Sequence, residues 1–272
     1  MTYVLKIGGG AGVDHQAVIR NLAERIHVGE RWVLVHGTSA AADELATRLG
    51  VPVRTITSPG GHISRHTDAQ MIGIYGMAAA AVNQQLCAEL SGYGVRVAGL
   101  TGPTVISAQR KQAIRAIQNG RLVVIRDDFS GRITGIDRDL LESLLDGGYT
   151  PVIAPLAIGE AGESLNVDGD LIAATAARAL NADLLMILSN VPGLLRDVND
   201  PASVIENFAL HDLERYENFA AGRMKKKLLA AREATIERVI LADSRQENPI
   251  DAAIAGSGTH IWREGQPVGH HA

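Results

Sequence analysis

Lysines stand beside glycines near both ends of this chain, in positions suited to binding phosphate. The apolar run at residues 3–7 contains Lys6 and leads directly into three glycines at residues 8–10. A lysine in an apolar strand is costly unless its ammonium group meets an anionic partner. A backbone without side chains also lets N–H groups approach an anion closely. The pattern predicts a site for a phosphoryl group, and a tight turn with Lys6 at a sheet edge is the alternative.

A second lysine cluster lies in "GRMKKK", residues 222–227, which opens a predicted helix. Cations oppose the positive end of the helix dipole, so this cluster favours a nearby anion; a solvated first turn is the alternative. Phosphoryl transfer needs charge neutralisation more than covalent help. Lys6 and one of Lys225 to Lys227, approaching from opposite sides with an aspartate between them, would supply it.

The elements that must position these residues alternate between strand and helix. Residues 2–9 and 31–37 predict strands, while residues 14–29 and 39–50 predict helices, with Ser39 as a possible N-cap. This rhythm implies a mostly parallel sheet covered on both faces. Ligands bind at the carboxyl ends of such strands, where "KIGGG" and "VHGTSA" stand. "LNVDGD", residues 165–170, precedes a helix whose N-terminus attracts anions, or whose N-cap lies in the "DGD" of Asp168 to Asp170.

The alternation is interrupted between about residues 104 and 135. Two turns, Asn-Gly and Ser-Gly, separate β-type runs here, and we expect an antiparallel excursion on the edge of the main sheet. The excursion is rich in cations: Arg110, Lys111, Arg115, Arg121, Arg126 and Arg132. They form either a docking surface for an acidic partner or an ordinary solvated edge that discourages strand pairing.

Composition excludes several classes of protein. The net charge of −4 and the 4% aromatic content argue against nucleic-acid binding. No apolar run reaches the roughly 18 residues that span a membrane, and the sequence opens directly on a strand, so we expect a cytoplasmic protein without a secretory leader. Cys87 is the only cysteine, which rules out an internal disulfide. The histidines of the closing "GHHA" are interpreted as a tail, and no metal-ligating residue is predicted.

In order and spacing, these motifs resemble those of the amino acid kinase family, and within it the N-acetylglutamate kinase group. "KIGG" is similar to the family's first lysine and glycine turn, and "VHG" to the start of its His-Gly-Gly-Gly turn. "NVDGD" resembles its Asn-x-x-x-Asp, and "GRMKKK" its Gly-Gly-Met-x-x-Lys. "LSNVPGLL" resembles its nucleotide-side turn, and "GSGT" its final hairpin. The resemblance covers essentially the whole chain.

The resemblance implies a three-layer αββα sandwich with a central, mostly parallel sheet, formed by one domain over residues 1–272. A substrate-binding N-lobe would take about residues 1–160, and an ATP-binding C-lobe about residues 161–272. It implies ATP with Mg²⁺ and transfer of a phosphoryl group to a carboxylate, giving an acyl phosphate. It also suggests a homodimer through the long apolar helix at residues 69–90.

The resemblance also implies roles for individual residues. Lys6 and Lys227 would stabilise the transition state, and Asp170 would organise them. Phosphate would meet the backbone of Gly8, Gly9 and Gly37. The substrate would meet His36, Gly37, Thr38, Arg65 and Asn166, with Arg65 on a carboxylate and Asn166 at the amide end.

Two departures from the family pattern bear on the acceptor. Thr38 and Ser39 replace the last two glycines of the second turn, and the substrate loop reads "SPGGHISRHTD". Both resemble a branch of the family that phosphorylates α-aminoadipate carried on the protein LysW, in lysine biosynthesis. Arg110, Lys111, Arg115 and Arg121 would then meet an acidic carrier. Free N-acetylglutamate in arginine biosynthesis, carrier-bound glutamate, and a non-catalytic amino-acid sensor are the alternatives.

Overall fold

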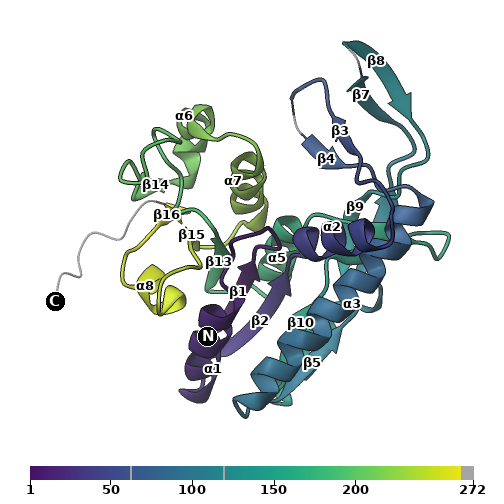
Figure 1. Ribbon diagram of the computed structural model, residues 1–272. Helices are drawn as coiled ribbons and strands as arrows, with labels where there is room; N and C mark the ends of the chain where they lie inside the picture. The colour runs from purple at the N-terminus through teal and green to yellow at the C-terminus, as the bar shows by residue number, and fades with distance from the viewer. Residues whose placement is uncertain (62, 119, 265–272) are drawn as a thin grey trace.

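An eight-stranded sheet runs through the centre of the computed structural model, which describes residues 1–61, 63–118 and 120–264 (Figure 1). The histidines of "GHHA" lie outside these residues. The strand order is β14-β16-β15-β13-β1-β2-β10-β5, and every pairing is parallel except β15 with β16. The strands are β1 (Thr2–Ile7), β2 (Arg31–His36), β5 (Val97–Leu100), β10 (Thr150–Ile153), β13 (Leu184–Ser189), β14 (Asn207–Ala209), β15 (Arg238–Asp243) and β16 (Thr259–Trp262). The mostly parallel central sheet is confirmed.

Helices cover both faces of this sheet, which confirms the three-layer arrangement. The helices are α1 (His15–His27), α2 (Ser39–Arg48), α3 (Ala69–Gly92), α4 (Arg138–Asp146), α5 (Gly169–Ala179), α6 (Leu213–Tyr216), α7 (Arg223–Ala234) and α8 (Pro249–Ile254), with short 3-10 turns at Gly102–Thr104, Leu210–Asp212 and Glu217–Phe219. Apolar residues of α1, α3 and α8 share one core cluster, and those of α4, α5 and α7 share another. Within the described ranges, no helix has the length and apolar character needed to cross a membrane.

The alternation of side chains along each strand decides which helices a residue faces. In β1, Leu5 and Ile7 belong to the core cluster of α1, α3 and α8, whereas Val4 belongs to the cluster of α4, α5 and α7. Lys6 has the same parity as Val4, so it points to the side of α5 and α7. His36, at the end of β2, has the parity of Leu34 and points to the side of α1 and α3.

The strands from the two parts of the chain occupy opposite halves of one sheet, on either side of the boundary between β1 and β13. Strands β2, β10 and β5 extend from one edge of β1, whereas β13, β15, β16 and β14 extend from the other. The chain leaves β1 towards β2 and leaves β13 towards β15, so the connections diverge between β1 and β13. In parallel sheets such a divergence opens a crevice at the carboxyl ends of the strands.

The antiparallel excursion does not lie on the edge of the main sheet, so that expectation was wrong. Strands β6 (Ile106–Arg110) and β9 (Gly131–Ile136) join β11 (Leu156–Ile158) and β12 (Ser164–Asn166) in a separate four-stranded sheet. Strands β7 (Ile114–Gln118) and β8 (Arg121–Ile125) form a hairpin, as do β3 (Thr55–Thr57) and β4 (Ile63–Arg65). The two hairpins project together from the body (Figure 1). They share a small core of their own, in which Ile56 packs with Ala116 and Ile125, and this core holds them away from the main sheet.

Local signals start the helices that carry the candidate site. Asp168 is the N-cap of α5, since its carboxylate accepts from the N–H of Asp170. Gly222, with φ of 52°, precedes α7 and adopts a conformation that favours glycine. Ser39 was wrongly expected as an N-cap: Thr38 holds that position, and Ser39 is the first helical residue. The Ser39 hydroxyl instead donates to the Gly9 carbonyl at 2.8 Å, and so joins the two glycine turns.

Candidate active site

One buried carboxylate holds two lysines that are 221 positions apart in the chain (227 − 6). Lys6 Nζ lies 2.6 Å from Asp170 Oδ1, and Lys227 Nζ lies 3.2 Å from Asp170 Oδ2. All three residues are buried: Lys6 is 7% exposed, Asp170 5% and Lys227 6%. They come from the end of β1, the first turn of α5 and the second turn of α7. The structure therefore brings together the three residues that the sequence assigned to catalysis.

Burial and charge act against each other in this triad. Burial alone would raise the pKa of Asp170, but the charges of Lys6 and Lys227 and the hydrogen bonds they donate hold it well below its usual range. Burial lowers the pKa of Lys227, and Asp170 opposes that shift while Lys6 adds to it. The triad carries one net positive charge in a nearly dry position, and such a charge is well placed to attract an anion.

The two predicted glycine turns pack backbone against backbone beside the triad. A Cβ added at Gly9 would lie 2.1 Å from Thr38 N and from Gly37 C, and one added at Gly37 would lie 2.3 Å from Gly9 N. Any side chain at either position would push the turns apart. The Ala40 N–H also donates to the Gly9 carbonyl at 2.7 Å. The ends of β1 and β2 thus form one joint surface.

Only some of the expected backbone donors are available for an anion. The Gly8 N–H donates to the Leu188 carbonyl and the Gly37 N–H donates to the Ile7 carbonyl, both at 2.9 Å. Within the described part of the chain, the N–H groups of Gly9 and Thr38 have no acceptor. The N–H groups of Gly8 and Gly37 are therefore occupied inside the protein, and Gly9 and Thr38 are the candidates for donating to phosphate or substrate oxygens.

The expected substrate-side residues lie around the second turn and are already held by neighbours. The Arg65 guanidinium pairs with Asp43 at 2.5 Å and donates to the Ser39 carbonyl at 3.1 Å. Asn166 Nδ2 donates to Thr67 Oγ1 at 3.0 Å. These contacts fix the orientation of Arg65 and Asn166 before any substrate arrives.

A network of hydrogen bonds supports the segment that contains Thr67. Asp128, which is fully buried, accepts from the N–H of Thr67 at 2.8 Å and from the N–H of Ser130 at 2.7 Å. Phe129 N–H donates to the Thr67 carbonyl, and Asn166 N–H donates to the Phe129 carbonyl. Asp128 thereby joins the segment after β4 to the segment before β9, and positions Thr67 for its contact with Asn166.

Arg223 adds a further cation beside the first glycine turn. It is the first residue of α7, in the place of the second glycine of the Gly-Gly-Met-x-x-Lys motif. A Cβ added at Gly10 would lie 2.7 Å from Arg223 Nη1, so the guanidinium lies directly against the first glycine turn. Lys226, by contrast, pairs with Asp168 at 2.9 Å and is partly exposed.

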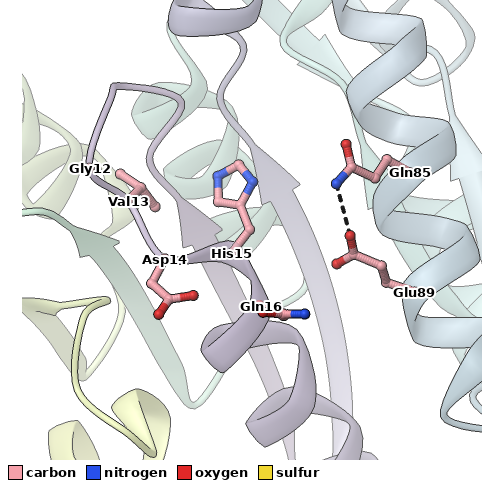
Figure 2. Close-up of a pocket in the computed structure, with 7 residues that line it drawn as sticks. All are labelled: Gly12, Val13, Asp14, His15, Gln16, Gln85 and Glu89. Carbon is pink, nitrogen blue, oxygen red and sulfur yellow. Dashed lines mark hydrogen bonds between the residues drawn. The ribbon is translucent and has the colours of Figure 1, made fainter.

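An open hollow of about 510 Å³ lies on the far side of the first glycine turn, between α1 and α3 (Figure 2). It is lined by Gly12, Val13, Asp14, His15, Gln16, Gln85 and Glu89. None of the residues predicted for the site lines it, although His15 Nε2 lies 3.1 Å from the Gly8 carbonyl. No group of three or more potential metal ligands occurs in the described ranges.

The cationic residues of the excursion divide into two groups. Arg110 is held against the body, since its guanidinium lies 3.7 Å from the centre of the Phe129 ring and donates to the Asp128 carbonyl. Lys111, Arg115 and Arg121 are exposed. Arg115 and Arg121 stand on the β7–β8 hairpin, beside Ile117, Leu122 and Val124, which are 38%, 58% and 50% exposed.

Sequence reasoning missed several residues that hold the site. Asp43, Thr67 and Asp128 carry no motif, because they act through contacts made across loops. Asn83 had a visible signal: it is a polar residue in the middle of the apolar helix run "AAAAVNQQL", and it lies buried against His36. A polar residue in an apolar helix must find a partner.

Comparisons with known proteins agree with this geometry. Residues 1–242 match the amino acid kinase family. The [LysW]-aminoadipate kinase of Deinococcus radiodurans is 43% identical over 264 residues, which cover 95% of this chain and 90% of that protein. The enzyme of the same name from Thermus thermophilus is 39% identical over 266 residues, covering 95% of this chain and 99% of that protein.

A solved structure shows the same fold at lower sequence similarity. N-acetylglutamate synthase from Neisseria gonorrhoeae, in complex with coenzyme A and N-acetyl-glutamate, aligns with a TM-score of 0.78 at 23% identity. The alignment covers 97% of this chain and 59% of that one.

Replacement of Asp170 by asparagine should destabilise the protein in a pH-dependent way. The substitution leaves two buried ammonium groups without a counter-ion, at a cost of about 3–5 kcal/mol near pH 7. Since the pKa of Asp170 is depressed in the folded state, its contribution is complete above the unfolded value of about 4 and is lost as the pH falls through the folded value. Urea unfolding should therefore show a gap between wild type and Asp170→Asn that is constant above about pH 5 and narrows below about pH 4.

Asp168→Asn is the matched control. It keeps an N-cap residue of equal preference and alters only a partly exposed pair, so its cost should stay below about 1 kcal/mol. An equal loss of stability in both variants would contradict the assignment of Asp170 as the buried counter-ion.

Proposed function

Because the chain belongs to the amino acid kinase family, we propose that it transfers the γ-phosphoryl group of ATP to the side-chain carboxylate of α-aminoadipate carried on LysW. The product is an acyl phosphate, in lysine biosynthesis. The observation that carries the proposal is the buried triad, in which Asp170 holds Lys6 and Lys227 beside two glycine turns. The names of the relatives at 43% and 39% identity support the choice of acceptor.

The proposed reaction needs no proton transfer. A carboxylate oxygen of the acceptor forms a bond to the γ-phosphorus, the bond from phosphorus to the β,γ-bridging oxygen breaks, and ADP leaves with the bonding electrons. Negative charge moves from the acceptor towards the leaving ADP. Lys6, from β1, would neutralise the acceptor side, and Lys227, from α7, the nucleotide side. Asp170 would keep both ammonium groups charged and aligned.

The other site residues are assigned by their place around the triad. The N–H groups of Gly9 and Thr38 would donate to oxygens of the migrating group, and the close packing of Gly9 against Gly37 would hold the two turns together. Arg65 would bind a carboxylate of the acceptor, and Asn166 its amide end, while His36 lies behind the second turn. Tyr75 lies beside Arg65, with the guanidinium 6.0 Å from the ring centre.

The two halves of the sheet would divide the substrates between them. We assign the acceptor to about residues 1–160 and ATP to about residues 161–272. On the nucleotide side, the turn after β13 and the turn before β16 are tied together, since the Leu194 N–H donates to Thr259 Oγ1 at 2.8 Å. Mg²⁺ would enter with the phosphates of ATP, because this ion is usually bound by substrate phosphates together with only one or two carboxylates.

The projecting β7–β8 hairpin is the surface proposed for the carrier. Arg115 and Arg121 would meet an acidic partner, and Ile117, Leu122 and Val124 would give it apolar contact. Lys111 and Arg110 lie at the base of the hairpin. The neighbouring β4 ends in Arg65, which contacts Asp43 and the Ser39 carbonyl beside the second turn. A carrier bound at the hairpin would therefore lie next to the substrate side.

Two assignments extend this function. We propose a homodimer through α3, because Met77 is 54% exposed on this helix. We also propose that the protein acts in the cytoplasm, where ATP is available.

A kinase for free N-acetylglutamate in arginine biosynthesis, or for carrier-bound glutamate, is the second candidate. The replacement of two glycines by Thr38 and Ser39, together with the exposed cationic hairpin, favours the carrier-bound acceptor.

The acceptor is tested by a coupled assay of ADP release. LysW bearing α-aminoadipate should be turned over efficiently, and free N-acetylglutamate should not, because only the carrier reaches the hairpin. LysW bearing glutamate is the third acceptor in the comparison. Efficient turnover of N-acetylglutamate without turnover of either carrier conjugate would overturn the proposal, and no turnover of any acceptor would favour an amino-acid sensor.

Substitution of either triad lysine by methionine should reduce kcat much more than substrate binding. Loss of one transition-state cation is expected to lower kcat by about 100-fold or more, while KM for ATP changes little. Lys226→Met, one residue from Lys227 and outside the triad, is the control and should keep its rate. A wild-type kcat in Lys6→Met or Lys227→Met would refute the assigned role.

Charge reversal on the hairpin should weaken the carrier alone. In Arg115→Glu/Arg121→Glu, KM for LysW-aminoadipate should rise about tenfold at low salt, and the difference from wild type should shrink as salt is added. KM for ATP should stay constant. Arg138→Glu, an exposed substitution on α4, serves as the control; a matching rise of KM in that variant would assign the effect to net charge and not to docking.

A further inference from the structure

His36 lies behind the second glycine turn, where its ring is held from two sides. The residue is fully buried, and its parity in β2 turns it towards α3. Its Nε2 lies 3.2 Å from Asn83 Nδ2, and its Nδ1 lies 3.2 Å from the Gly37 carbonyl oxygen. The ring thus connects the middle of α3 with the peptide group that follows β2.

The contacts of Asn83 determine the tautomer of His36. The side-chain nitrogen of Asn83 lies 2.9 Å from the Val152 carbonyl oxygen, which only accepts. The reverse orientation of the amide would set two acceptors against each other, so Nδ2 must be the atom that faces both Val152 and His36. Its second N–H then points at His36 Nε2, which must be unprotonated. The ring proton belongs to Nδ1, where it is donated to the Gly37 carbonyl.

The surroundings are built to hold this arrangement. A Cβ at Gly99 of β5 would lie 2.6 Å from Asn83 Oδ1, so the glycine makes room for the amide. Cys87 Sγ, one helical turn along α3, lies 3.7 Å from the same oxygen and donates to it. Burial also lowers the pKa of His36 to about 4, so the ring is neutral at physiological pH.

Holding the Gly37 carbonyl has a direct consequence for the site. The peptide bond is trans, so the carbonyl of Gly37 and the N–H of Thr38 point in opposite directions. With the carbonyl turned back to His36, the Thr38 N–H is turned towards the first glycine turn, and Thr38 N lies against Gly9. Thr38 Oγ1 lies farther from His36 Nδ1, at 3.5 Å, and does not replace the carbonyl.

We propose that Asn83 is a positioning residue for the phosphoryl transfer: it fixes His36 in the Nδ1–H tautomer, and His36 in turn aims the Thr38 N–H at the reacting groups. The inference rests on the proposed function for the identity of the reaction. Its chain of contacts runs from the Val152 carbonyl through Asn83 and His36 to the Gly37 peptide. Asn83 touches no reacting atom and acts only through this chain.

The first test needs no variant. Long-range ¹H–¹⁵N NMR spectra of the wild-type protein at pH 7 should show His36 with its proton on Nδ1 and with Nε2 unprotonated. A His36 protonated on Nε2 would overturn the inference, whichever acceptor the enzyme uses. This outcome is independent of the substrate, so it is separate from a failure of the proposed function.

The second test changes Asn83. Asn83→Leu removes both donors in a similar volume, and Asn83→Asp offers only acceptors, which should draw the ring proton to Nε2. Both should lower kcat by about 10- to 100-fold with KM for ATP changed less than about twofold, measured with whichever acceptor the wild type turns over. His36 should populate both tautomers in the first variant and the Nε2–H form in the second.

A control on the same helix separates this role from general damage to α3. Gln85 lies on the side of α3 that faces the open hollow, where it bonds to Glu89 (Figure 2), so Gln85→Leu should leave kcat and the His36 tautomer unchanged. Lower stability with a wild-type kcat in both Asn83 variants would show a merely structural role and overturn the proposal. If neither variant folds, the wild-type spectrum still decides the tautomer.

Discussion

The carboxylate of Asp170 is the constraint on which the candidate site depends. Two ammonium groups that are less than a tenth exposed would repel each other and lose their hydration without a counter-ion between them. The carboxylate meets one lysine with each oxygen, and it is supplied by the first turn of α5, where the Asp168 cap starts the helix. The packing of α5 against β1 and α7 therefore brings the charges together, and the charges in turn require that packing.

A second constraint joins the ends of β1 and β2. Gly9 and Gly37 touch through their backbones, and Ser39 and Ala40 bond to the Gly9 carbonyl. The two turns cannot move independently, so a group bound by one is held by the other as well. The N–H groups of Gly8 and Gly37 are in addition bonded to the carbonyls of Leu188 and Ile7. These internal contacts make the two turns rigid, and they leave fewer backbone N–H groups free to bind a ligand.

The surface proposed for the carrier lies on a different part of the molecule from the triad. The triad lies at the carboxyl ends of the central strands, whereas the exposed apolar and cationic residues stand on the projecting hairpins (Figure 1). Their separate core, around Ile56 and Ala116, lets this surface vary without disturbing the main sheet. Arg65, at the end of β4, connects the two regions.

The sequence alone determined the alternation of elements, the parallel sheet and the three charged residues of the triad. Strand and helix periods are local properties, so they can be read from short stretches of sequence. The glycine turns and the lysines form short motifs, and the family resemblance assigned these motifs to one site. Only the tertiary structure decided that the excursion forms a separate sheet and that the N–H groups of Gly8 and Gly37 donate to neighbouring strands. It also decided that the Asn83 side chain contacts the ring of His36. Each of these depends on which side chains and carbonyls meet across long separations, from Ile56 with Ala116 to Asn83 with Val152. Contacts of that kind leave no period in the sequence, because hydrogen-bond partners and packed faces are chosen only when the elements come together in space.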